Sequence, residues 1–114
     1  MKPVKCEPPA IPVIENIHQK VFDAVSKPNA LNMQAWHTCE TRHCRAGWVV
    51  QLAGEAGKAL EDFYDTPLAA SLIYQASSAL KVTIPRFYDS REVAMSDMQR
   101  LADEEAALKG AGHA

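Results

Sequence analysis

The sequence predicts a mainly α-helical protein, a small domain of four helices with irregular connections and at most one short two-stranded pairing. Apolar residues recur at three-and-four spacing in several segments, as on one face of a helix. Proline and glycine signals separate those segments. The length of 114 residues, with 47% apolar and 23% charged residues, fits one globular domain that needs no disulfide or metal to fold.

Each predicted helix begins or ends at a recognisable signal. Pro12 suits a first turn, where its missing N–H leaves no bond unmade, and Pro28 disfavours helix in the residue before it. Asp65 followed by Pro67 forms another start signal, and Gly110 is a natural stop. The helices are therefore expected at residues 12–26, 43–56, 66–80 and 90–108.

The remaining stretches are expected to be extended or loose. Leu31–Trp36 and Val82–Phe87 have no helical period, and their alternating apolar residues favour short extended pieces. Residues 1–10 are expected to be a flexible N-terminal segment, residues 11–109 the single helical domain, and residues 110–114 a flexible tail.

Composition argues against several partners. The formal net charge of −2 gives no overall field that would attract phosphates, so a nucleic-acid partner is not expected. No apolar run approaches the roughly 18 to 20 residues that span a bilayer, so no membrane partner is expected. Pro8, Pro9 and Pro12 interrupt the stretch before Glu15, which argues against a secretory signal and favours a cytoplasmic location.

Basic and aromatic residues alternate in one connection, at Lys81, Arg86, Phe87, Tyr88 and Arg91. Such a pattern can stack bases and hold phosphates. The simpler expectation is a connection whose aromatic side chains pack inward.

The segment Trp36–Trp48 reads WHTCETRHCRAGW and is the candidate site. It holds two of the four histidines, two of the three cysteines and both tryptophans of the chain. Packing is the simplest interpretation. Free cysteine behaves as a small apolar residue, so Trp36, Cys39, Cys44 and Trp48 would be buried while the histidines stay partly exposed.

Three other interpretations remain open. A disulfide between Cys39 and Cys44 would close a short loop ahead of the second helix. A metal site would use His37, Cys39, His43 and Cys44, whose thiolate and imidazole groups suit tetrahedral zinc, although their spacing is unusual for it. A reactive thiol is the last interpretation, because a helix N-terminus and a nearby histidine would lower the pKa of Cys44.

The run from Cys39 to Trp48 resembles the C-x4-C-x-A-G-W signature of short uncharacterised proteins from bacteria and their phages. The resemblance covers roughly Asn32–Leu60. It implies no activity. It does imply that Cys39, Cys44, Gly47 and Trp48 act together and that the gene belongs to a mobile or accessory repertoire.

The motif also predicts a packing arrangement. Trp48 follows Cys44 by one helical turn, so both are expected to face the core, with the indole ring touching Leu52. Gly47 is expected to admit a neighbouring backbone, either at Trp36 or from the first helix. His43 is expected to be an exposed cap.

Two functions follow as hypotheses. The first is a small non-catalytic interaction or regulatory protein that binds a protein partner or a second copy of itself, since no catalytic constellation is recognisable and an enzyme is not expected. The second is a metal-binding or thiol-redox protein centred on Cys39 and Cys44. No cofactor is expected under the first, and zinc is the cofactor to consider under the second.

Overall fold

The computed structural model describes residues 8–111, and over that range the chain is mainly helical, as the sequence predicted. The described residues contain five α-helices, one 3-10 helix and a two-stranded antiparallel sheet. In chain order these are α1 (Ile17–Val25), β1 (His37–Cys39), β2 (Arg42–His43), α2 (Arg45–Leu52), α3 (Gly54–Phe63), α4 (Thr66–Ser77), η1 (Ile84–Tyr88) and α5 (Arg91–Ala111).

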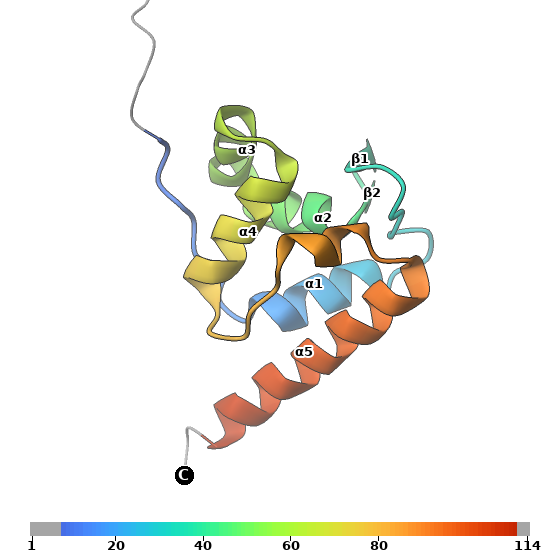
Figure 1. The fold of residues 1–114 in the computed structure, drawn as a ribbon. Helices are drawn as coiled ribbons and strands as arrows, with labels where there is room; N and C mark the ends of the chain where they lie inside the picture. Colours follow the sequence, from blue (N-terminus) through green and yellow to red (C-terminus); the bar gives the residue numbers. More distant parts are fainter. Residues whose placement is uncertain (1–7, 112–114) are drawn as a thin grey trace, which may run out of the picture.

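The helices pack around one apolar core (Figure 1). The long helix α5 runs along one side of the molecule with α1 against it, and α2 lies near the centre beside α4. The β1–β2 hairpin and α3 occupy the end opposite to α5. The core draws on every helical element, with Ile17, Val21, Val49, Leu60, Ile73, Phe87 and Met98 among its most buried residues.

Helix α1 begins later than Pro12, where the sequence predicted it. Asn16 precedes the helix in a left-handed conformation, with φ of 58°, and its side chain makes no capping hydrogen bond. The carboxylate of Glu105 in α5 instead accepts the backbone N–H groups of His18 at 3.2 Å and Gln19 at 2.9 Å. A distant residue therefore satisfies donors that a local capping side chain usually satisfies.

The helix predicted at residues 43–56 is two helices, so the described chain has five rather than four. α2 ends at Leu52 and α3 starts at Gly54, whose φ of +66° suits a residue without a side chain. Gly57 then lets the two helices approach, because a Cβ at this position would lie 2.5 Å from the carbonyl oxygen of Val50.

The strand pairing exists, but at other residues than predicted. β1 and β2 pair His37 with His43 and Cys39 with Arg42. The predicted piece Leu31–Trp36 contributes only an isolated bridge from Leu31. Most of the other predicted piece is η1, whose first turn contains a proline with its φ already close to the helical value.

The chain ends fall partly outside the described residues. Met1–Glu7 and residues 112–114 lie beyond them, so the expected flexible segments are not described there. α5 continues through Gly110 to Ala111, so Gly110 does not end it as predicted. Among residues 8–111, no helix is both long and apolar enough to cross a membrane.

Candidate functional site

The two halves of the motif meet at Gly47. A Cβ on Gly47 would lie 1.8 Å from the carbonyl oxygen of Trp36, which is closer than any real contact. The same oxygen accepts the backbone N–H of Cys44 at 3.2 Å. This confirms the expected role of Gly47 and shows that Trp36 supplies the approaching backbone.

Trp48 faces the core, as expected. Its side chain is almost wholly buried, and its Nε1–H donates to the carbonyl oxygen of Ala30 at 2.6 Å. The ring of His43 packs against the indole with 4.7 Å between centroids in an edge-on arrangement. The predicted inward position of Leu52 was wrong, since that side chain is partly exposed.

Cys44 is a buried helix cap rather than a reactive thiol. It precedes α2, and its Sγ accepts the backbone N–H of Gly47 at 3.3 Å. Burial raises the pKa of the Cys44 thiol above its ordinary value, and hydrogen bonds from Gly47 and Ala46 offset this only in part. The expected lowering of this pKa was therefore wrong, because desolvation outweighs the helix terminus.

Cys39 is the accessible thiol of the motif. It is exposed on β1, where the packing interpretation expected it to be buried. The Thr41 hydroxyl lies 3.6 Å from its Sγ, and this hydrogen bond, with others from the Thr41 and Arg42 backbone, lowers the pKa of the Cys39 thiol. Cys39 and Cys44 are both free, because one sulfur faces solvent and the other faces the core.

His37 and His43 form a chain of hydrogen bonds that links the hairpin to α3. Their Nδ1 atoms lie 2.7 Å apart, and His37 Nε2 lies 2.6 Å from the carboxylate of Glu61. His43 Nε2 lies 2.9 Å from the carbonyl oxygen of Glu40. The Thr66 hydroxyl donates to the same Glu61 oxygen at 2.7 Å.

The acceptors fix where the protons sit. The carbonyl of Glu40 can only accept, so His43 donates to it through Nε2. The ionised Glu61 carboxylate likewise accepts from Nε2 of His37. One further proton lies between the two Nδ1 atoms and completes the chain.

The pKa shifts of His43 and Glu61 favour a neutral His43 ring and an ionised Glu61 carboxylate. Burial lowers the pKa of His43 below its ordinary value, which favours the neutral ring, so the expectation of an exposed cap was wrong. Burial alone would raise the pKa of Glu61, but hydrogen bonds from His37 and Thr66 outweigh it and hold that pKa below the ordinary value.

The four proposed zinc ligands do not converge. Within residues 8–111, no three His, Cys, Asp or Glu side chains are arranged to hold a metal ion. Both nitrogens of His37 and of His43 take part in the hydrogen-bond chain, and the sulfur of Cys44 is turned toward Gly47. An open cleft of about 380 Å³, which we call the hairpin cleft, is nevertheless lined by His37, Cys39, His43, Lys58 and Glu61 among others.

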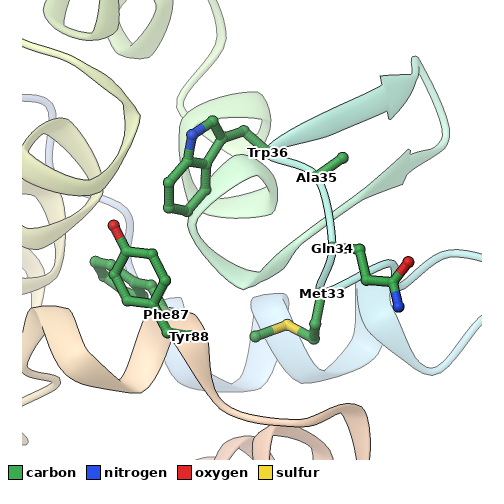
Figure 2. A pocket seen from close by; sticks show the side chains of 6 residues that line it. All are labelled: Met33, Gln34, Ala35, Trp36, Phe87 and Tyr88. Carbon is green, nitrogen blue, oxygen red and sulfur yellow. The ribbon is translucent and has the colours of Figure 1, made fainter.

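A second hollow lies beside the segment that leads into β1 (Figure 2). This aromatic pocket, of about 250 Å³, is lined by Met33, Gln34, Ala35, Trp36, Phe87 and Tyr88. The Trp36 and Tyr88 rings meet nearly at right angles with 5.6 Å between centroids. Met33 and the three rings surround the gap, while Gln34 points away from it.

The expectation that the aromatics near η1 pack inward was half right. Phe87 is fully buried, but Tyr88 is 66% exposed. The sequence did not indicate the aromatic pocket, because its two walls lie about fifty positions apart along the chain, at Met33–Trp36 and Phe87–Tyr88.

A buried arginine inside the motif was also missed. Arg45 is 0% exposed, and its Nη1 donates to Asp97 of α5 at 2.7 Å. Its Nε donates to the hydroxyl of Tyr74 at 3.2 Å, and its guanidinium lies 5.6 Å from the centre of that ring. Arginine is seldom fully buried unless paired, and no local pattern indicated a partner in another helix.

The chain matches no family model, no curated protein and no solved structure. The resemblance carried by Cys39, Cys44, Gly47 and Trp48 therefore stays a prediction.

Proposed function

We propose that this protein is a non-catalytic interaction protein that binds a protein partner through its aromatic pocket. The observation that carries the proposal is Tyr88, which stands 66% exposed beside Trp36 at the mouth of the pocket. Tyrosine and tryptophan are enriched in protein interfaces and in the few residues that dominate binding energy. Their rigid rings bury a large area at a small entropic cost.

The size and chemistry of the pocket favour an anchor side chain over a substrate. Its volume of about 250 Å³ is below the roughly 300 to 1,000 Å³ of most small-molecule sites. Its lining contains no carboxylate, imidazole, thiol or ammonium group. The Tyr88 phenol is the one group of the lining that could transfer a proton, and a pocket with so little acid–base chemistry suits binding rather than catalysis.

The geometry of the motif would serve this role by holding the pocket wall in place. The backbone of Trp36 is held against Gly47 and accepts a hydrogen bond from Cys44. Phe87 is anchored in the core beneath Tyr88. Walls that are fixed before binding reduce the ordering cost of association. A regulatory role in a mobile or accessory element would be one use of such a surface.

Peptide selection tests the proposal. Peptides selected for binding from a random library are measured again against Trp36→Ala, Tyr88→Ala and Tyr64→Ala. Tyr64 is a partly exposed tyrosine outside the pocket and serves as the matched control. We expect at least about tenfold weaker binding for the two pocket variants and no change for Tyr64→Ala. Selected peptides that bind all variants equally would refute the pocket as the site.

A second candidate function is thiol exchange at Cys39. This thiol is exposed in the hairpin cleft, its pKa is lowered by hydrogen bonds from Thr41, and Lys58 lines the same cleft. A Cys39 thiolate would attack a small disulfide, form a mixed disulfide and release the other half as a thiolate.

Mass spectrometry after incubation with oxidised glutathione tests this candidate. Cys6, the third cysteine of the chain, lies outside the described residues and is replaced by serine in every sample. In this background we expect one added half-glutathione that disappears when Cys39→Ser is added, while Cys44 stays unmodified in the folded protein because it is buried. Equal modification of Cys6→Ser and of the double variant Cys6→Ser, Cys39→Ser would rule out thiol exchange at Cys39.

A further inference from the structure

The chain carries an exposed, proline-rich arm at residues Pro8–Val13. Ile11 is 41% exposed and Val13 is 68% exposed, so both aliphatic side chains of the arm are open to solvent. The arm is fixed at its end, because Ile14 is buried and its N–H donates to the hydroxyl of Ser77 in α4 at 2.9 Å. The molecule thus exposes a short apolar segment whose C-terminal end is held against α4.

The exposure of the arm repeats every three residues. A polyproline II helix has three residues per turn, so residues three apart share an edge. Pro9 and Pro12 share one edge and are both half-buried, whereas Pro8 and Ile11 share another and are both exposed. The prolines fix their own φ values near those of this helix. The arm therefore offers a stiff, extended edge to solvent.

We infer that the aromatic pocket of one copy of the protein receives the Pro8–Val13 arm of a second copy. This inference rests on the proposed function and names the partner. Aromatic-lined grooves recognise polyproline II segments, whose stiffness lowers the entropy lost on binding. The pocket, of about 250 Å³, is lined by Met33, Trp36 and Tyr88, which suits the exposed Pro8–Ile11 edge.

The placement of the arm favours exchange between copies. Figure 1 shows the arm beside α4 and leading away from the domain on that side. The chain before β1 and the end of η1, which form the pocket, lie on the opposite side. The arm of one copy therefore points away from its own pocket, and its exposed edge remains available without detaching Ile14 from α4. Two reciprocal contacts would close a dimer.

A mixing experiment tests the inference. Ile11→Asp places a charge on the arm, and Tyr88→Ala removes a wall of the pocket. Both positions are well exposed, so the fold is retained, which circular dichroism verifies. In sedimentation experiments we expect the wild type to self-associate and each variant alone to associate at least about tenfold more weakly.

The two variants mixed together should recover a complex of one copy of each. The Tyr88→Ala chain supplies an intact arm and the Ile11→Asp chain supplies an intact pocket, so one arm–pocket contact can form. Tyr64→Ala is the control and should associate like the wild type. A monomeric wild type, or a mixture that recovers no complex, overturns the inference.

A synthetic peptide of residues 8–14 separates this inference from the proposed function. We expect it to bind the wild type and to bind Tyr88→Ala at least about tenfold more weakly. If this peptide does not bind but library-selected peptides still require Tyr88, the arm is not the ligand and the interaction function stands. If neither the arm peptide nor the library-selected peptides bind more weakly to Tyr88→Ala than to the wild type, both proposals fail.

Discussion

At the scale of single residues, Gly47 sets the geometry of the motif. The Trp36 carbonyl oxygen occupies the space that a side chain on Gly47 would need. We expect Gly47→Ala to lower the free energy of unfolding by about 3 kcal/mol or more, because the hairpin must move and the Cys44 hydrogen bond is lost. Urea denaturation measures this change.

Gly54→Ala is the matched control for that variant. Gly54 has a positive φ, but nothing lies within 4 Å of a Cβ placed there. Gly54→Ala should therefore lower the free energy of unfolding by only about 1 kcal/mol, from backbone strain alone. Equal losses of stability in Gly47→Ala and Gly54→Ala would mean that the close approach of Trp36 to Gly47 does not contribute to stability.

His43 should make stability depend on pH. Its pKa lies below the ordinary value in the folded protein because burial disfavours the charged ring. In the unfolded chain it takes up a proton as the pH falls through about 6.5. The stability that neutral His43 contributes is therefore fully present above that pH. It is lost as the pH falls toward the pKa of His43 in the folded protein. His18 adds to the same trend, since burial also lowers its pKa.

Urea denaturation at pH 7.5 and pH 5.5 measures this dependence. His43→Gln keeps an amide donor for the carbonyl oxygen of Glu40 but cannot titrate. We expect its loss of stability between the two pH values to be smaller than that of the wild type. An unchanged pH dependence in His43→Gln would show that His43 does not remain neutral in the folded state.

At the scale of secondary structure, Glu105 joins the two terminal helices. Its carboxylate accepts two backbone N–H groups at the start of α1, where Asn16 provides no cap. We expect Glu105→Ala to lower the free energy of unfolding by about 1 to 2 kcal/mol, as for a lost helix cap. Thermal or urea unfolding followed by circular dichroism measures the loss.

Glu104 is the matched control for that substitution. It is exposed on the same helix and pairs only with the exposed Arg100 within the described chain. Glu104→Ala should therefore change stability by less than about 0.5 kcal/mol. Comparable losses at both positions would contradict the capping role of Glu105.

Arg45 and Asp97 join α2 to α5 through a buried ion pair. Their side chains are 0% and 5% exposed, and Arg86 and Arg100 also lie within 4.0 Å of the Asp97 carboxylate. Burial alone would raise the pKa of Asp97, but hydrogen bonds from Arg100 and Arg45 hold it below the ordinary value. The pair is therefore ionised, and each partner needs the other.

Replacing Arg45 alone should lower the free energy of unfolding more than replacing both Arg45 and Asp97. We expect Arg45→Met to lower the free energy of unfolding by about 3 to 5 kcal/mol, because Asp97 loses its buried counter-charge. The double variant with Asp97→Leu should recover part of that loss, although Arg86 and Arg100 then lose a partner. If the loss of stability in the double variant equals the sum of the losses in the two single variants, Arg45 and Asp97 are not coupled.

At the scale of the whole molecule, Trp48 connects the motif to the rest of the core. Its indole donates to Ala30 and packs against His43, so it ties the loop after α1 to the hairpin and α2. We expect Trp48→Ala to lower the free energy of unfolding by about 3 to 5 kcal/mol, of the roughly 5 to 15 kcal/mol typical of a domain.

Chemical denaturation of Trp48→Ala measures that loss, with Tyr88→Ala as an exposed aromatic for comparison. Tyr88 is 66% exposed, so its removal should change stability by less than about 1 kcal/mol. A wild-type unfolding midpoint for Trp48→Ala would mean that the indole is not part of the core.

The helical class and the packing of Gly47 and Trp48 could be predicted from the sequence. Helical periodicity is a local property, so the spacing of apolar residues indicated α1, α4 and α5 even though their ends shifted by several residues. A glycine inside an apolar helical stripe likewise indicates a close approach, whatever residue approaches.

Only the tertiary structure decided the chemistry of the motif. Cys39 and Cys44 look alike in the sequence, but one is exposed and the other is buried, and their pKa values move in opposite directions. Arg45 forms an ion pair with Asp97, and the ring of Trp36 packs against Tyr88. Both partners lie about fifty residues away along the chain. Desolvation and pairing depend on which distant groups the fold brings together, and local sequence patterns do not contain that information.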